Sequence, residues 1–204
     1  MQPDDRPMTL EEFIEQYDRE GSVVLLEGKR DVLPEDRLKL ETLGRMLAER
    51  TKHIRFRSGN AAGADEYFSK GVAEVNPNRL EVITPYAGHR QGPSLAGYTI
   101  PLDEVDLVNE PEVIYQTANN RRNEQLVRRY VDGNRDRNTI KAAYLLRDTI
   151  KVTGTGSGIP PASFGIFYDD LSNPGQGGTG HTMDVCRNKN VPLIDQLVWF
   201  HWLS

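Results

Sequence analysis

Short apolar runs alternate along the chain with segments in which apolar residues recur at helical spacing. Ser22–Leu26 and Phe164–Tyr168 are nearly continuous apolar runs, as in strands that are buried on both faces of a sheet. Between them, Leu40, Leu43 and Leu47 lie three and four residues apart, which is typical of a helix with one apolar face. This alternation predicts an α/β protein with an open, mostly parallel sheet and helices on both faces.

The same pattern predicts the remaining elements. Thr9–Glu12 is a capping box that begins an amphipathic helix, so residues 1–20 are expected to pack as an N-terminal helix on a single domain of residues 21–204. Tyr86–Pro101 has three glycines and two prolines and is expected to be a loop. Further strands are expected at His53–Arg57, Leu80–Thr84, Ile150–Thr153 and Val191–Ile194.

Composition and charge narrow the classes of partner. The net charge is −5, which argues against a general nucleic-acid binder, and no apolar run is long enough for a membrane span. Cys186 is the single cysteine and Met1–Asp5 is acidic rather than apolar, so a cytoplasmic protein is expected. The segment from Arg121 to Lys151 contains nine basic and four acidic residues. This local excess of positive charge favours binding of a small anion.

Two glycine-rich segments lie between an expected strand and an expected helix, namely Ser58–Asp65 and Gly175–His181. Glycine permits a sharp turn, and the amides that begin a helix attract phosphate. Neither segment is a P-loop or a dinucleotide fingerprint. With the turn after the first strand, they supply the expected ligand-binding residues, which are Gly28, Arg30, Ser58, Gly59, Asn60, Gly63, Asp65, Gly177, Gly178, Thr179, Gly180 and Thr182.

Four patches together resemble a Rossmann-like superfamily that joins the DNA-processing protein A family to the LOG (lysine-decarboxylase-like) nucleotide phosphoribohydrolases. The patches are Val24–Arg30, Ser58–Asp65, Arg137–Asn138 and Gly177–Thr182. The second patch is similar to the phosphate loop of the DNA-processing branch and its small nucleotide-sensing relatives. The last patch is similar to the glycine motif of the LOG branch. The resemblance implies a Rossmann-like fold.

The LOG resemblance also implies catalytic residues. The catalytic glutamate of that family corresponds to Asp184 in this sequence, and an arginine of that family corresponds to Arg137. His181 lies at the start of the expected helix and is the third candidate. In that family a carboxylate assists cleavage of the bond between a base and ribose 5-phosphate. Here the carboxylate is one methylene shorter, and Gln176 and His181 replace the family's proline and threonine.

Three functions remain open from the sequence. The favoured one is binding of a phosphate-bearing small nucleotide-type ligand, without nucleic acid, membrane or cofactor. The alternative is hydrolysis of nucleoside 5′-monophosphates. Single-stranded DNA binding is disfavoured because the chain is acidic and shows no basic–aromatic stripe. No Cys/His cluster is present, so no metal is expected. The apolar tail Leu197–Phe200 leaves a homodimer open as an alternative to packing on its own domain.

Overall fold

The computed structural model describes residues 6–119 and 121–204, so the acidic start of the chain, Met1–Asp5, lies outside the described residues. Its strands are β1 (Val23–Gly28), β2 (Arg55–Ser58), β3 (Leu80–Thr84), β4 (Tyr98–Pro101), β5 (Phe164–Tyr168) and β6 (Leu193–Ile194). They form one sheet in the order β4-β3-β2-β1-β5-β6, in which the described neighbours all pair in parallel. The chain starts at a central strand, winds to one edge and returns, which is a Rossmann-like arrangement.

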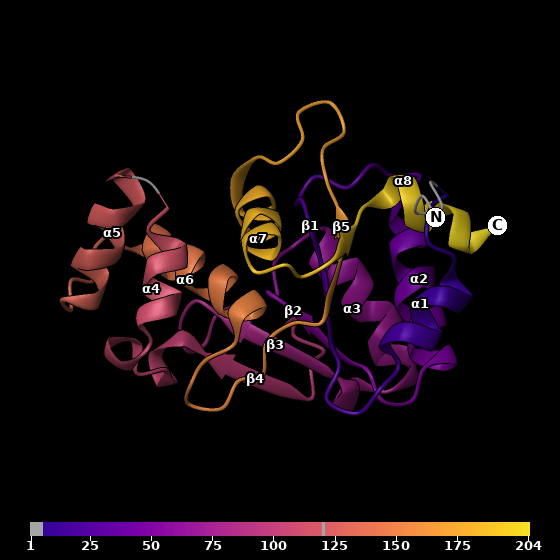
Figure 1. The fold of residues 1–204 in the computed structure, drawn as a ribbon, viewed down its shortest axis with the longest axis horizontal. Coiled ribbons are helices and arrows are strands. Elements are labelled where there is room, and N and C mark those ends of the chain that lie inside the picture. The colour runs from indigo at the N-terminus through magenta and orange to yellow at the C-terminus, as the bar shows by residue number, and fades with distance from the viewer. Residues whose placement is uncertain (1–5, 120) are drawn as a thin grey trace, which may run out of the picture.

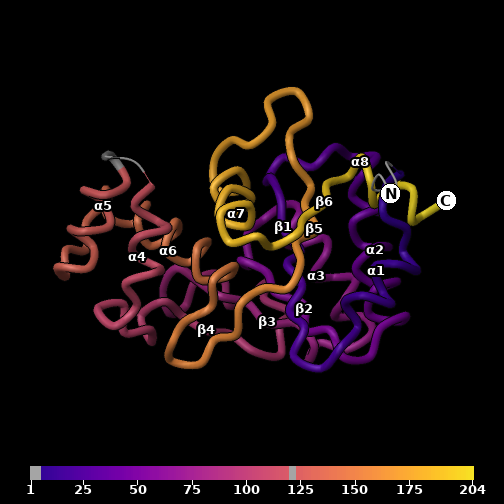
Figure 2. Tube along the Cα trace, viewed as in Figure 1, coloured from indigo at the N-terminus to yellow at the C-terminus, as the bar shows by residue number. Residues whose placement is uncertain are grey.

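Helices cover both faces of this sheet (Figures 1 and 2). One face carries α1 (Leu10–Tyr17), α2 (Arg37–Arg50), α3 (Ala64–Val75) and α8 (Gln196–Trp199). The other carries α4 (Pro111–Thr117), α5 (Arg121–Val131), α6 (Ile140–Thr153) and α7 (Gly177–Asn188). Short 3-10 turns are found at Pro77–Arg79, Leu102–Glu104, Leu107–Asn109 and Phe200–Leu203. The predicted fold class is therefore confirmed.

Side chains alternate between the two cores along each strand. In β1, Val24 and Leu26 pack in the core under α1, α2 and α3, whereas Leu25 packs in the core under α7. This follows from the two-residue period of a strand, which places successive side chains on opposite faces. A central parallel strand is therefore apolar throughout, as the run Ser22–Leu26 predicted.

Two predictions of secondary structure need correction. Ile150–Thr153 is the last turn of α6 and not a strand, because Ala143, Leu146 and Ile150 continue one helical face until Gly154, at φ +64°, ends the helix. Tyr86–Pro101 is not a loop throughout, since its last four residues form β4 at the edge of the sheet. The edge strand is not visible in a local pattern, because its pairing with β3 decides it.

The apolar C-terminal tail packs on its own domain. Trp199 is fully buried, and its indole Nε1 donates to the Phe167 carbonyl oxygen at 2.8 Å. The Nε1 of Trp202 donates to the Met8 carbonyl oxygen at 2.8 Å, which joins the tail to the segment that leads into α1. Within the described part of the chain, no helix combines the length and the apolar character that crossing a bilayer requires.

Candidate functional site

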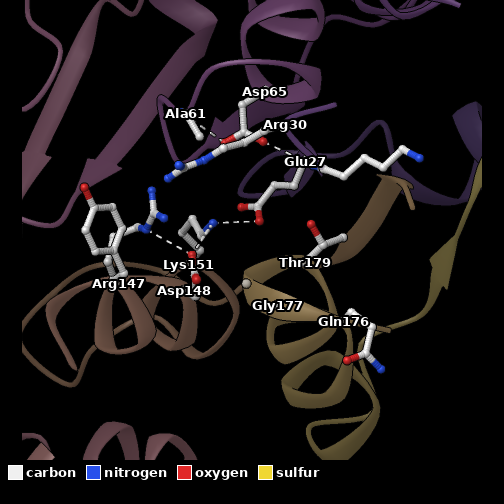
Figure 3. A pocket seen from close by; sticks show the side chains of 14 residues that line it. Glu27, Arg30, Ala61, Asp65, Arg147, Asp148, Lys151, Gln176, Gly177 and Thr179 are labelled. Atoms are coloured by element: carbon white, nitrogen blue, oxygen red, sulfur yellow. Dashed lines mark hydrogen bonds and ion pairs between the residues drawn. The ribbon is translucent and has the colours of Figure 1, made fainter. Parts of the chain in front are cut away.

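A cavity of about 340 Å³ opens at the carboxyl ends of β1 and β5, where the strand order reverses (Figure 3). Ligands of open α/β sheets bind at such a position. The two glycine loops meet here, although more than a hundred residues separate them. The lining comes from Glu27, Gly28, Lys29, Arg30, Ala61, Asp65, Tyr144, Arg147, Asp148, Lys151, Gln176, Gly177, Gly178 and Thr179.

The first glycine loop is closed by a carboxylate of the chain itself. Asp65 is buried at the start of α3 and accepts hydrogen bonds from three backbone amides. The amide of Gly28 donates at 3.1 Å, that of Gly59 at 3.1 Å and that of Ala61 at 3.3 Å. The amides that were expected to hold a phosphate therefore already bind an anion. This loop is a structural joint between β1 and β2.

The glycines of this joint allow backbones to approach closely. A Cβ on Gly63, whose φ is +91°, would lie 2.2 Å from the Arg30 carbonyl oxygen. A Cβ on Gly28 would lie 2.3 Å from the Tyr168 carbonyl oxygen. Ser58 is fully buried, and the Asn60 side-chain Nδ2 donates to the His89 and Arg90 carbonyl oxygens, so Asn60 anchors the loop after β3.

Asp65→Ala is expected to lower the free energy of unfolding by about 2–3 kcal/mol, because buried amides lose a charged acceptor. Urea denaturation of the purified chain measures the change. Asp31→Ala is the matched control: Asp31 is exposed in the neighbouring loop, and its removal should change stability by about 0.5 kcal/mol or less. Equal stability of the two variants would contradict the role of Asp65 as the acceptor of the joint.

The second glycine loop is open. Gly177 and Gly178 are exposed at the start of α7, and the Gln176 side chain makes no capping hydrogen bond. The N–H groups of Gly177, Gly178 and Thr179 belong to the first turn, so no helical carbonyl is placed to accept from them. Gly180 approaches the Gly175 backbone, and the Thr182 hydroxyl donates to the Gly178 carbonyl oxygen, so these two residues support the turn. The start of α7 thus presents free amides and a partial positive charge.

A buried charge network forms one wall of the cavity. The Lys151 Nζ lies 2.6 Å from Glu27 and 2.8 Å from Asp148, and Arg147 Nε lies 2.9 Å from Asp148. Burial raises the pKa of Glu27 to about 7 against the opposing attraction of Lys151. Burial also acts to raise the pKa of Asp148, but Arg147 and Lys151 hold it below its ordinary value. The sequence analysis missed Glu27 and Lys151, which stand among apolar residues.

Three rings gather beside the cavity, and we call Tyr86, His89 and Tyr144 the ring cluster. The ring centroids of Tyr86 and His89 are 5.2 Å apart, and those of His89 and Tyr144 are 5.8 Å apart. The Tyr144 hydroxyl lies 3.3 Å from His89 Nε2. Tyr86 is 37% exposed and the other two rings are half-buried. The cluster joins the loop after β3 to the first half of α6.

Three guanidinium groups surround this cluster, and we call Arg30, Arg90 and Arg147 the arginine group. Burial, followed by the charges of these three arginines, lowers the pKa of His89 to about 4. His89 is therefore neutral at neutral pH, mainly because it is buried, and the positive charges of the three arginines act in the same direction. Arg147 lies over the Tyr144 ring, with its Cζ 5.5 Å from the ring centroid.

Of the three residues expected to be catalytic, the structure brings Asp184 and His181 to one hollow and leaves Arg137 apart. Asp184 is exposed and bound to Arg187 at 2.7 Å. His181 is buried with Nε2 3.0 Å from the Thr149 hydroxyl, and burial lowers its pKa. Both border a neighbouring hollow, whereas Arg137 is exposed in the connection before α6 and lines neither space. Among the described residues, no group of three His, Cys, Asp or Glu side chains could hold a metal ion.

Among known proteins, the chain shows similarity to a solved structure. No family model matches the chain, and no curated protein matches it. Among solved structures, the chain is similar to DNA processing protein A from Helicobacter pylori, whose structure is described for its single-stranded DNA binding mode. The identity is 15% and the TM-score 0.45, over 85% of this chain and 64% of that protein. The chain thus spans less than two thirds of that protein's length, and the likeness is one of fold.

This comparison contradicts two predictions from the sequence. The sequence favoured a small nucleotide-type ligand, with N-glycosidic hydrolysis as the alternative, and excluded nucleic acid as a partner. The solved structure of DNA processing protein A is described for its single-stranded DNA binding mode. Two features of the present structure bear on these corrections. Asp65 occupies one of the two loops expected to hold phosphate. The residues of the arginine group and the ring cluster are distant in the sequence, but the fold brings them together beside the carboxyl ends of the strands.

Proposed function

We propose that this chain binds single-stranded nucleic acid at the carboxyl edge of its sheet. The observation that carries the proposal is the arginine group around the ring cluster, beside the free amides that begin α7. Proteins that bind single strands combine cations for the backbone with aromatic rings on which bases stack. Both components are present here within one continuous edge.

The positive charge of this edge is local. The chain as a whole carries a net charge of −5, so long-range attraction to a polyanion is weak. A duplex presents a rigid array of phosphates and hides the faces of its bases, so it gains little from the rings. A single strand bends, brings a few phosphates to the cations and exposes its bases for stacking. The local charge and the partly exposed rings therefore favour a single strand over a duplex.

The three arginines differ in how free they are to bind phosphate. Arg147 is buried against Asp148, and Arg90 is bound to Glu66 at 2.7 Å. Arg30 is exposed and forms no ion pair with the described residues. It lies at the cavity mouth (Figure 3). Arg30 is therefore the side chain from which the largest share of phosphate binding is expected.

Fluorescence anisotropy with a labelled oligothymidylate tests the proposal. At physiological salt we expect dissociation constants of about 10⁻⁴ to 10⁻⁶ M, as for binding without sequence preference, and tighter binding at low salt. A duplex of the same length should bind more weakly. Absence of binding to the single strand at low salt, or equal affinity for the duplex, would overturn the proposal.

Tyr144→Ala is expected to weaken binding of the single strand by about 5- to 160-fold, since a stacked base contributes about 1–3 kcal/mol. Titration of the labelled oligothymidylate gives the ratio of dissociation constants. Tyr115→Ala is the matched control, because Tyr115 is 72% exposed on α4 and does not line the cavity. Equal affinities of both variants and the unchanged chain would show that Tyr144 holds no base.

Several expectations from the sequence remain predictions beside this proposal. They are a specific kinship with the LOG branch, the division into an N-terminal helix of residues 1–20 and a domain of residues 21–204, a cytoplasmic location, and a homodimer. Of the expected ligand-binding residues, we retain Arg30, Gly177, Gly178 and Thr179 in the proposed site. They offer a cation and free amides at one cavity mouth.

A further inference from the structure

Glu27 carries a buried oxygen without a partner. One carboxylate oxygen is held by Lys151 at 2.6 Å, while the other, Oε1, is shielded from solvent and accepts no hydrogen bond in the structure. The residue is only 4% exposed and lines the cavity. Figure 3 shows the carboxylate near the centre of the lining residues, with Lys151 on one side. A buried acceptor of this kind is costly unless a donor reaches it.

The surroundings of Glu27 define the donor that would satisfy it. Lys151 already balances its charge, and Arg147 stands close by, bound to Asp148. A cationic donor would be repelled by Lys151 and Arg147, so the donor that fits is an uncharged N–H or O–H group. At the mouth of the same cavity, the first amides of α7 favour an anion. The cavity thus combines a place for phosphate with a place for a neutral donor.

We propose that one nucleotide of the bound strand enters this cavity. Its phosphate lies at Gly177 and Gly178, and an N–H or O–H group of its nucleoside donates to Glu27. The inference rests on the proposed function, since it concerns a strand already held at the ring cluster. The cavity volume of about 340 Å³ lies within the range of small-ligand pockets. Taking one nucleotide out of the stack costs a few kcal/mol, least in a single strand.

The neutral donor can come from two parts of a strand. Ring N–H and amino groups belong to bases along the whole strand, whereas a sugar O–H is free only at a strand end in DNA. Three oligonucleotides of equal length separate these sources: an oligothymidylate, the same strand with every thymine methylated at N3, and an oligothymidylate with a phosphate on both ends. The N3-methylated strand keeps its base faces for stacking on the ring cluster but lacks the base N–H, so loss of affinity for this strand alone assigns the donor to a base. Loss for the end-blocked strand alone assigns it to a terminal hydroxyl.

Glu27→Gln tests the contact itself. In this variant the amide oxygen turns to Lys151 and the NH₂ group faces the cavity, so a donor of the ligand meets another donor. At about pH 8, where Glu27 is ionised, we expect the dissociation constant of the unmodified oligothymidylate to rise about tenfold, since the lost bond is one to a charged acceptor. Electrostatics alone would give the opposite sign, because the variant removes a negative charge from a site for an anion.

Ala61→Leu narrows the cavity and leaves the side chains of the charge network unchanged. This second variant tests entry of the nucleotide even if Glu27→Gln does not fold. Its matched control is Ala87→Leu, since Ala87 is exposed and lies outside the cavity lining. Circular dichroism checks the fold of each variant. We expect Ala61→Leu to weaken binding of the oligothymidylate about tenfold, and the control variant to bind it with unchanged affinity.

The failures of the two proposals are distinguishable. If the unchanged chain binds none of the three strands, the proposed function is wrong. If it binds them, but Ala61→Leu and folded Glu27→Gln bind the unmodified strand as tightly as the unchanged chain does, the strand stays outside the cavity. The second result overturns this inference alone and leaves binding at the ring cluster intact.

Discussion

Lys151→Met is expected to lower the free energy of unfolding by about 3–5 kcal/mol, the usual cost of removing one partner from a buried ion pair. Lys151 is 1% exposed and touches both Glu27 and Asp148. Methionine fills a similar volume but leaves two buried carboxylates with Arg147 as the cation of the network. The loss is measured by urea denaturation followed by circular dichroism.

This loss should depend on pH. The folded-state pKa of Glu27 is about 7, above its ordinary value of 4.5, so the folded chain binds this proton more tightly than the unfolded chain does. Between these values, a falling pH therefore stabilises the folded state through Glu27. Without Lys151 the pKa of Glu27 rises further, because the attraction that opposes burial is gone. The deficit of the variant should then be larger at about pH 8 than at about pH 5.5.

The matched control for this prediction is Lys141→Met, since Lys141 lies on the same helix but is exposed. Its stability should differ from that of the unchanged chain by about 0.5 kcal/mol or less at either pH. A Lys151→Met variant as stable as this control would show that the network does not hold β1 against α6. A deficit that grows on acidification would show that Glu27 is not the group being neutralised.

The sheet was predictable because its central strands are local features of the sequence. The run Ser22–Leu26 is apolar at successive positions, which a strand with helices on both faces requires. The edge strand Tyr98–Pro101 was missed because its pairing with β3 fixes it, and an edge strand needs no apolar run. Ile150–Thr153 was misassigned because its alternation of apolar Ile150 and Val152 with polar Lys151 and Thr153 resembles a strand, although the segment continues the apolar face of a helix.

The candidate site was only partly predictable. The glycine loops are short sequence motifs, and their meeting at one cavity follows from their places after parallel strands. That Asp65 fills the first loop depends on the side-chain geometry of the folded joint. Glu27 could have been noticed, because strand alternation places it on the same face as Leu25, where a carboxylate needs a partner. The ring cluster could not, since its residues come from two segments more than fifty residues apart.

Arg30→Glu is expected to weaken binding of an oligothymidylate at least about tenfold at low salt. The change removes a cation from the cavity mouth and places an anion next to the start of α7, so a phosphate loses one attraction and meets one repulsion. The slope of log affinity against log salt concentration should also become shallower by about one, as one phosphate contact is lost. Fluorescence anisotropy over a series of salt concentrations measures both quantities.

Arg19→Glu is the control that makes this result specific. Arg19 is exposed in the turn before β1, at the opposite edge of the sheet, and its replacement changes the net charge by the same amount. If binding depended on net charge alone, the two variants would weaken it equally. If the strand lies at the carboxyl edge, Arg19→Glu should keep both the affinity and the salt slope of the unchanged chain. Equal losses in the two variants would therefore show that binding depends on net charge alone and that the strand does not lie at the arginine group.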